Sequence, residues 1–201
     1  MPAEVILLTG EVEGPHFQAL LESLNPRLKI IHVQSSDELE IACLKPTPEG
    51  GRRLIAFCTS VIVPKDILNG LSFEAYNFHS GPPTYPGSHS ASFAIYEGAK
   101  HFGVTVHVME EKVDCGPIVV FERLLIQENI RFMELELESY ELLLKIFTNL
   151  APHIATSNKP LPIIDVHWSG HKHTNAEFEN MKIIEADMDE AEIRLRFRAF
   201  G

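Results

Sequence analysis

The sequence predicts an α/β protein with a shortened Rossmann-like core and a mostly parallel sheet. Three observations support this fold class. Residues 5–8 are all apolar, which is typical of a strand covered on both faces. A helical pattern at 17–24 and a second apolar strand at 28–33 complete a βαβ unit. Residues 104–108 alternate valine with other residues, which indicates a further strand.

The remaining elements follow from apolar runs between turn-forming residues. We expect strands at 54–60, 75–78 and 118–121, a loop and short helix at 61–71, and helices at 90–97, 133–150 and 189–200. The segment 34–53 contains two prolines and a Gly-Gly pair and is too short for another strand and helix. It is therefore expected to be mainly loop, or one short helix, so the core is trimmed.

Length and the element pattern set the domain organisation. A chain of 201 residues and 22.6 kDa suits one sizeable domain. We expect the core domain at 1–150 and a loop-and-helix extension at 151–201 that packs on it. No apolar run reaches the roughly 18 residues of a membrane span, and residues 1–8 lack the basic and long apolar regions of a signal peptide.

Net charge and cysteine content limit the classes of binding partner and the cellular compartment that we expect. The net charge is -11, from 17 basic and 28 acidic residues. Because nucleic-acid binding depends on Lys and Arg, we do not expect a large RNA or DNA partner. Three cysteines without paired spacing are typical of a reduced compartment, so a cytoplasmic protein without membrane contact is expected. A homodimer is left open.

Two polar segments carry the candidate chemistry. Asn77 and His79 are two apart on an extended segment, so their side chains point the same way. Asp114 follows the strand that ends near residue 109. Ligands of open α/β sheets bind at the carboxyl ends of strands, where we expect the three to converge. The amide can donate to an oxyanion, the imidazole can transfer a proton, and the carboxylate can hold the imidazole. The alternative is structural: the same residues cap a Pro/Gly-rich loop and a turn.

The two segments also resemble the signatures of a known family. Residues 77–87, Asn-Phe-His-Ser-Gly-Pro-Pro-Thr-Tyr-Pro-Gly, are similar to the first signature of the formyltransferases that use 10-formyltetrahydrofolate. Residues 103–118, which run from Gly-Val-Thr-Val-His-Val-Met to Val-Asp-Cys-Gly-Pro-Ile, resemble the second. The resemblance implies a formyltransferase core, catalytic roles for Asn77, His79 and Asp114, and 10-formyltetrahydrofolate as cosubstrate without a metal. Ser80 replaces the usual proline but removes no catalytic group.

The resemblance also implies a folate pocket. It would lie between the segment after the 54–60 strand and the loop 110–114, whose backbones would hold the pterin. The implied cofactor-binding residues are Ser60, Val61, Ile62, His107, Glu111, Val113 and Asp114.

The first strand-to-helix turn is the predicted acceptor-binding segment. A matching turn holds a phosphate in some family members. Glu11 and Glu13 would repel a phosphate here, so a structural turn is the better interpretation than a phosphate site. An amine acceptor with a neutral or positive tail fits better, and Gly10 and Glu11 are the predicted substrate residues.

A local group of histidines, His167, His171 and His173, lies in the tail. Histidines can bind zinc, but we see no supporting Cys or Glu spacing and expect exposed residues and no metal.

The predicted function is transfer of a formyl group from 10-formyltetrahydrofolate to a small amine acceptor. Two alternatives stay open: a 10-formyltetrahydrofolate hydrolase, in which water replaces the amine, and a non-catalytic folate-binding protein with a degenerate acceptor site.

Overall fold

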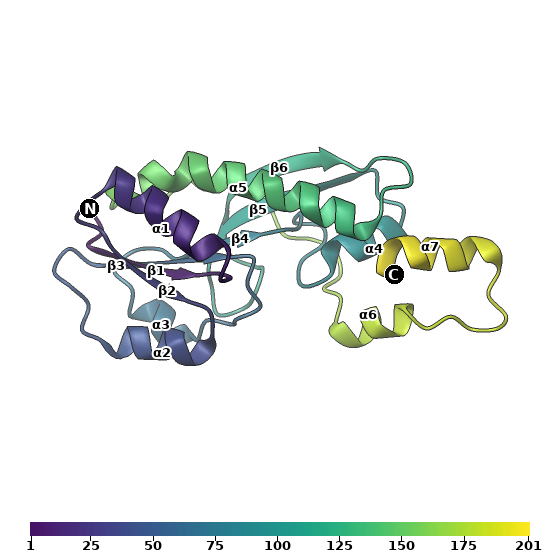
Figure 1. Ribbon diagram of the computed structural model, residues 1–201, viewed down its shortest axis with the longest axis horizontal. Helices are drawn as coiled ribbons and strands as arrows, with labels where there is room; N and C mark the ends of the chain where they lie inside the picture. Colours follow the sequence, from purple (N-terminus) through teal and green to yellow (C-terminus); the bar gives the residue numbers. More distant parts are fainter. The chain divides into compact units, whose positions relative to one another are not determined.

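The computed structural model describes residues 1–201 and contains a six-stranded sheet with helices (Figure 1). The strand order is β2-β1-β3-β4-β5-β6, which confirms the predicted α/β fold. In chain order the elements are β1 (Glu4–Leu8), α1 (Glu13–Leu24), β2 (Lys29–Val33), α2 (Ser36–Leu44), β3 (Arg52–Phe57), α3 (Lys65–Asn69), β4 (Tyr76–His79), α4 (Ser90–Tyr96), β5 (His101–Val108), β6 (Ile118–Leu125), α5 (Phe132–Thr156), α6 (Asn175–Met181) and α7 (Glu190–Phe200).

The sheet changes direction after β4. β1 pairs parallel with both β2 and β3, and β3 pairs parallel with β4. Met109, just after β5, donates its backbone N–H to the carbonyl of Ala75, just before β4, at 2.8 Å. β5 therefore runs opposite to β4. Val108 N donates to Pro117 O at 2.9 Å, which places β5 and β6 in an antiparallel hairpin.

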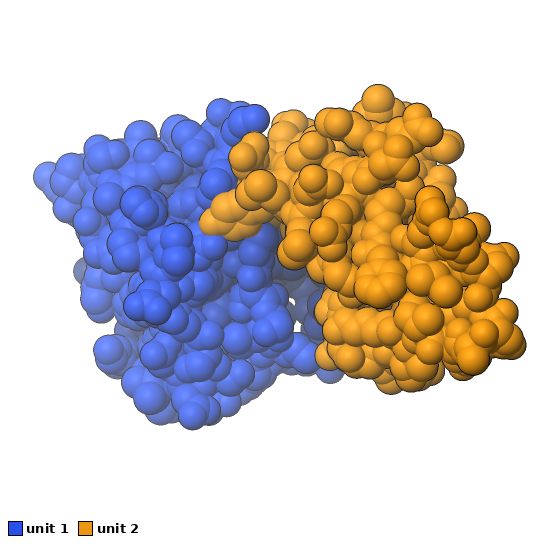
Figure 2. All heavy atoms as spheres, turned by 45° about the vertical axis from the view of Figure 1, so that its right-hand side comes forward, with its two compact units in different colours: residues 1–79, 106–120, 144–164 blue, residues 80–105, 121–143, 165–201 orange.

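Contacts divide the chain into two compact units (Figure 2). Unit 1 comprises residues 1–79, 106–120 and 144–164, and unit 2 comprises residues 80–105, 121–143 and 165–201. The predicted domain boundary at 150/151 falls inside α5, because Ala151, Ile154 and Ala155 are fully buried and continue the apolar face of the helix. No helix is both long enough and apolar enough to cross a membrane.

One face of the sheet in unit 1 is covered by α2 and α3 (Figure 1). Ile6, Leu54 and Ala56 on the strands pack with Leu39 of α2 in a single buried cluster. α2 begins after Ser35, whose side chain accepts a hydrogen bond from the Glu38 backbone at 3.3 Å. A single nine-residue helix in 34–53 confirms the expectation of a trimmed segment.

The opposite face of the sheet in unit 1 carries an aromatic cluster. Phe17 of α1 stacks on Phe147 of α5, with ring centroids 3.8 Å apart. Phe57 of β3 and Phe78 of β4 lie against the same ring, at 6.0 and 5.3 Å. Because side chains alternate along a strand, a buried Phe78 on this face directs its two neighbours in β4 to the other face.

Unit 2 has a separate core that includes buried aromatic residues. Phe93 of α4 lies edge-on to Phe200 of α7, with centroids 5.3 Å apart, and Phe178 of α6 contacts the same ring at 5.7 Å. The sequence patterns missed α6. This seven-residue helix begins at a capping box between Thr174 and Glu177, a local signal that was present in the sequence.

Candidate active site

β4 positions two of the predicted catalytic residues. Its burial alternates, with Tyr76 and Phe78 buried and Asn77 and His79 half-buried. Tyr76 anchors the strand: its hydroxyl donates to Glu74 Oε2 at 2.9 Å and accepts the Leu161 backbone N–H at 2.8 Å. Burial raises the pKa of Tyr76 to about 12, so the phenol stays protonated. β4 thus presents an amide and an imidazole on one face.

His107 of β5 lies directly across from Asn77. Antiparallel pairing brings the two side chains together on one face, with Asn77 Nδ2 3.1 Å from His107 Nε2. His107 Nδ1 lies 2.8 Å from the carbonyl of Val108, which can accept a hydrogen bond but not donate one. Nδ1 therefore carries a proton. In the neutral ring, Nε2 accepts from Asn77; in the charged ring, it is a donor.

The Asp114 carboxylate lies between two imidazoles. Its Oδ1 is 3.3 Å from His107 Nε2, and its Oδ2 is 3.9 Å from His79 Nδ1. The Asp114 and His107 side chains are each 3% exposed, and that of His79 is 11% exposed. Exclusion of water strengthens the interaction between a carboxylate and a protonated imidazole. Asn77, His107, Asp114 and His79 thus form a continuous polar chain.

The loop after β5 has to turn sharply to bring Asp114 back to this chain. Asp114 has a φ of 49°, in the left-handed region that non-glycine residues seldom occupy. A Cβ on Gly116 would lie 2.0 Å from the Val108 carbonyl oxygen, so only glycine fits there. Strained conformations of this kind cluster at functional sites.

The predicted folate-binding residues lie on two adjacent loops. Lys65 begins α3, directly after the loop that follows β3, and its Nζ is 2.6 Å from Glu111 Oε2 on the loop after β5. Ile62 on the first loop is 65% exposed, and Val113 on the second is 41% exposed. Ser60 is exposed and Val61 is half-buried. Exposed apolar side chains on two adjacent loops suit a flat ring, and the folate assignment stays a prediction.

The predicted acceptor residues lie at the carboxyl end of β1. Gly10 and Glu11 are exposed in the turn that leads to α1. Leu8 pairs with Ala56, so this turn and the loop after β3 lie at the same edge of the sheet. His32 Nε2 lies 3.1 Å from the Thr9 and Gly10 carbonyl oxygens. The role of Gly10 and Glu11 in acceptor binding stays a prediction.

The structure brings Asp114 to β4 by a different route from the one expected. From the sequence, we expected Asn77, His79 and Asp114 to meet at the carboxyl ends of neighbouring strands. β5 is antiparallel to β4, so that reasoning is wrong, and cross-strand pairing of Asn77 with His107 brings the groups together instead. The central position of His107 between the amide and the carboxylate was missed, because an alternating pattern does not reveal the direction of a strand.

An open, mostly parallel sheet with Asn77, His79 and Asp114 grouped in one polar site defines an α/β protein with a candidate active site, and comparisons show what it is similar to. Residues 53–141 match the family model described as formyl transferase. A methionyl-tRNA formyltransferase of Syntrophomonas wolfei is 31% identical over 107 residues, which cover 49% of this chain and 34% of that protein. The chain thus spans about a third of the length of this relative.

Solved structures share the fold. A sugar N-formyltransferase from a Shewanella species superposes with a TM-score of 0.79 at 14% identity, over 98% of this chain and 87% of that one. The N-formyltransferase of Helicobacter canadensis in complex with folinic acid and dTDP-3-aminofucose gives 0.70 at 14% identity, over 100% and 81%. These solved structures confirm the fold, and the formyl transferase model with the methionyl-tRNA formyltransferase similarity supports the resemblance to the folate-dependent formyltransferases that the two motifs predict.

Proposed function

We propose that this protein transfers the formyl group of 10-formyltetrahydrofolate to the amine of a small acceptor. The observation that carries the proposal is the continuous chain Asn77–His107–Asp114–His79, which places two donors and a buried carboxylate within one site of unit 1. The acceptor amine attacks the formyl carbon and forms a tetrahedral intermediate. The bond to N10 of the folate then breaks, N10 takes up a proton, and the products are a formamide and tetrahydrofolate.

Asn77 and His79 are the donors for the oxyanion. The Asn77 amide has two N–H groups, and one of them faces His107 at 3.1 Å. The other is free to donate to the formyl oxygen. His79 turns Nδ1 toward Asp114, so Nε2 is the nitrogen that donates to the oxyanion when the ring is protonated. Donors aimed at developing charge in a site sheltered from water contribute strongly to catalysis.

Asp114 is the proton acceptor, and His107 positions it. A carboxylate 3.9 Å from His79 Nδ1 favours the charged form of that imidazole. The same carboxylate takes up the proton that the attacking amine loses and can return it to the leaving nitrogen. His107 Nε2 lies within reach of both groups: in the neutral ring it accepts from the Asn77 amide, and in the charged ring it donates to the Asp114 carboxylate.

Folate as the formyl donor is supported by the family and by the two loops. The Helicobacter relative carries folinic acid, a formylated folate, in its structure. In this chain the loop after β3 and the loop after β5 are tied by the Lys65–Glu111 ion pair beside Asp114. A pterin between exposed Ile62 and Val113 would place the attached formyl group close to the Asn77 and His79 donors.

An amino sugar is the acceptor class that best fits the available observations. Two structural relatives are N-formyltransferases described with a sugar or an amino-sugar nucleotide. A net charge of -11 and exposed Glu11 disfavour the polyanionic tRNA that the methionyl-tRNA formyltransferases use. The proposed acceptor is therefore a small molecule whose amine is carried on a sugar.

The test is an acceptor comparison with the purified chain and 10-formyltetrahydrofolate. Tetrahydrofolate release is measured with a panel of free and nucleotide-linked amino sugars, with methionyl-tRNA, and with no acceptor. Release that requires an amino sugar, together with detection of the formamide product by mass spectrometry, supports the proposal. Equal release without any acceptor assigns a hydrolase, and folate binding without turnover in every arm assigns a binding protein.

A further inference from the structure

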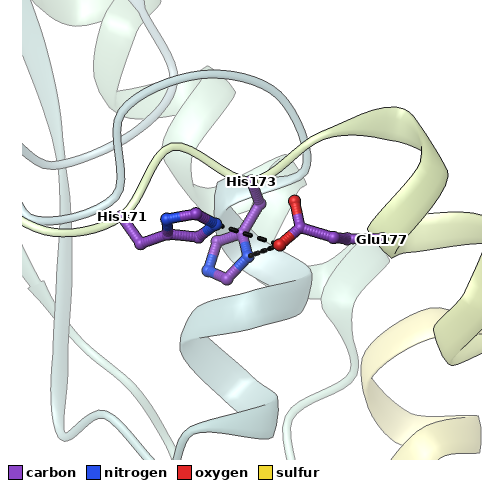
Figure 3. A group of neighbouring side chains, drawn as sticks. All are labelled: His171, His173 and Glu177. Carbon is purple, nitrogen blue, oxygen red and sulfur yellow. Dashed lines mark hydrogen bonds and ion pairs between the residues drawn. The ribbon is translucent and has the colours of Figure 1, made fainter.

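Unit 2 contains a second convergent group of histidines. In Figure 3 the rings of His171 and His173 approach the same carboxylate oxygen of Glu177. Oε1 of Glu177 is 2.9 Å from His171 Nε2 and 3.9 Å from His173 Nδ1. One potential ligand atom from each residue lies within 4.8 Å of the others. The expectation of exposed histidines is confirmed for His171, 64% exposed, and wrong for His173, 13% exposed.

A helix start holds the carboxylate in place. Glu177 is the third residue of α6, and its Oε2 accepts from the Thr174 backbone at 2.6 Å and from the Thr174 hydroxyl at 2.8 Å. This capping box leaves Oε1 directed at the two imidazoles. His171 and His173 precede Thr174 by three residues and one residue, so a short local segment supplies all three groups. The sequence patterns missed this ligand spacing, in which Glu177 follows the His171-x-His173 pair four residues after His173.

His173 has the surroundings of a metal-binding histidine. Its ring stacks on Phe93, with centroids 3.5 Å apart and planes 3° from parallel. Its Nε2 lies 3.3 Å from Glu97 Oε1, and a carboxylate there keeps the proton on Nε2. The lone pair of Nδ1 then faces Glu177. Nδ1 is buried and makes no hydrogen bond within the structure. Metal-bound histidines typically donate their second nitrogen to a carboxylate in this way.

We propose that His171, His173 and Glu177 bind a divalent transition-metal ion of the Zn²⁺ class, with Glu97 orienting His173. Metal–ligand bonds of about 2.0–2.2 Å place tetrahedral donor atoms roughly 3.3–3.6 Å apart. The two separations from Glu177 Oε1, 2.9 and 3.9 Å, bracket that spacing, and all three ligand atoms lie within 4.8 Å of one another. Rotation of exposed His171 can bring its nitrogen to the tetrahedral distance. Two imidazoles select Zn²⁺ over Mg²⁺ or Ca²⁺, and water completes the coordination.

The consequence for the molecule is a cross-link between the 165–174 segment and α6. A bound ion would join two histidines of an irregular segment to the first turn of a short helix, and through Glu97 to the end of α4. This site uses no residue of the Asn77–Asp114 constellation. It therefore stands whether or not the protein transfers formyl groups.

Zinc titration of the full chain tests the proposal. The protein is treated with a chelator, desalted and titrated with Zn²⁺ by calorimetry. We expect one saturable site in the wild type. His171→Ala should weaken Zn²⁺ binding at least tenfold, and Glu97→Gln should weaken it by about 10- to 100-fold through the orientation of His173. His167→Ala is the matched control, because this neighbouring histidine is 84% exposed and contacts Asp165 instead. It should bind Zn²⁺ like the wild type.

A second measurement separates the histidines from the free cysteines. Co²⁺ in place of Zn²⁺ should give the visible absorption of a low-coordinate nitrogen and oxygen site, without a thiolate charge-transfer band. Glu177→Gln should weaken binding while the chain stays folded, since glutamine also completes a capping box; far-ultraviolet circular dichroism checks this. Absence of a saturable site in the wild type, equal weakening by His167→Ala, or a thiolate band would each overturn the proposal.

Discussion

Two groups in this chain each place a carboxylate between two histidines, but one group is buried and the other is largely exposed. In unit 1, Asp114 lies between His79 and His107 with side chains at most 11% exposed, and sheet pairing holds the group. In unit 2, Glu177 and His171 are 43% and 64% exposed, and a capping box holds the carboxylate. The buried group depends on packing and pairing over long sequence separations. In the exposed group, Glu177 and His171 depend on local chain geometry, and only His173 depends on a distant residue, Phe93.

The largest expected effect comes from the core of unit 1. Phe147 is fully buried and stacks on Phe17 at 3.8 Å, so Phe147→Ala should lower the free energy of unfolding by about 3–5 kcal/mol. Urea denaturation measures this change. Phe197→Ala is the matched control, because Phe197 is 59% exposed, and it should cost under about 0.5 kcal/mol. Equal costs for the two variants would show that the aromatic cluster does not carry the stability assigned to it.

The next effect concerns catalysis by the buried group. His79→Ala and Asp114→Asn should each lower turnover of 10-formyltetrahydrofolate on the order of a hundred- to a thousandfold. The first variant removes an oxyanion donor, and the second removes the carboxylate that keeps His79 charged and takes up the amine proton. The loss in the double variant should be smaller than the product of the single losses, since the groups act as a unit. Steady-state kinetics give both values. Near-wild-type turnover in both single variants would make the constellation structural.

A smaller effect is expected where His107 positions its neighbours. His107→Gln should reduce turnover on the order of ten- to a hundredfold, because small displacements of catalytic groups are costly. Its kcat–pH profile should also shift, since His107 Nε2 lies 3.3 Å from Asp114. His101→Gln, at the exposed start of the same strand, should change neither quantity. A lower kcat with an unaltered pH profile would indicate a purely structural role.

The smallest expected effect concerns the capping box that holds Glu177 in the exposed group. Thr174→Ala removes the capping box of α6 and should cost about 1 kcal/mol in the stability of unit 2, whereas Thr174→Ser should retain it. Hydrogen exchange of the α6 amides reports the change. Turnover should be unaffected, because the cap lies in unit 2 and the proposed catalytic residues lie in unit 1. A loss of turnover comparable to that of His107→Gln would contradict the independence of the two groups.

Particular residues show how far the sequence patterns reach. The pairing of Asn77 and His79 on one face was predictable, because Tyr76 and Phe78 between and beside them are apolar and buried. The end of α5 was misjudged at 150, although Ile154 and Ala155 continue its apolar face. Pro152 lies inside α5 and does not end it. Helix α6 was missed because it buries a single apolar side chain, Phe178, and gives little periodicity.

By itself, the sequence determined the α/β class, the trimmed segment 34–53 and the identity of the Asn77, His79 and Asp114 candidates. Periodicity and turn residues act over a few positions, so the chain displays them directly. The tertiary structure decided the direction of β5, the bridging place of His107 and the burial of His173. Each of these depends on pairing or stacking with residues distant in sequence, such as Asn77 opposite His107 and Phe93 against His173. Such contacts form only when the whole sheet and core assemble, and an alternating pattern is compatible with either strand direction.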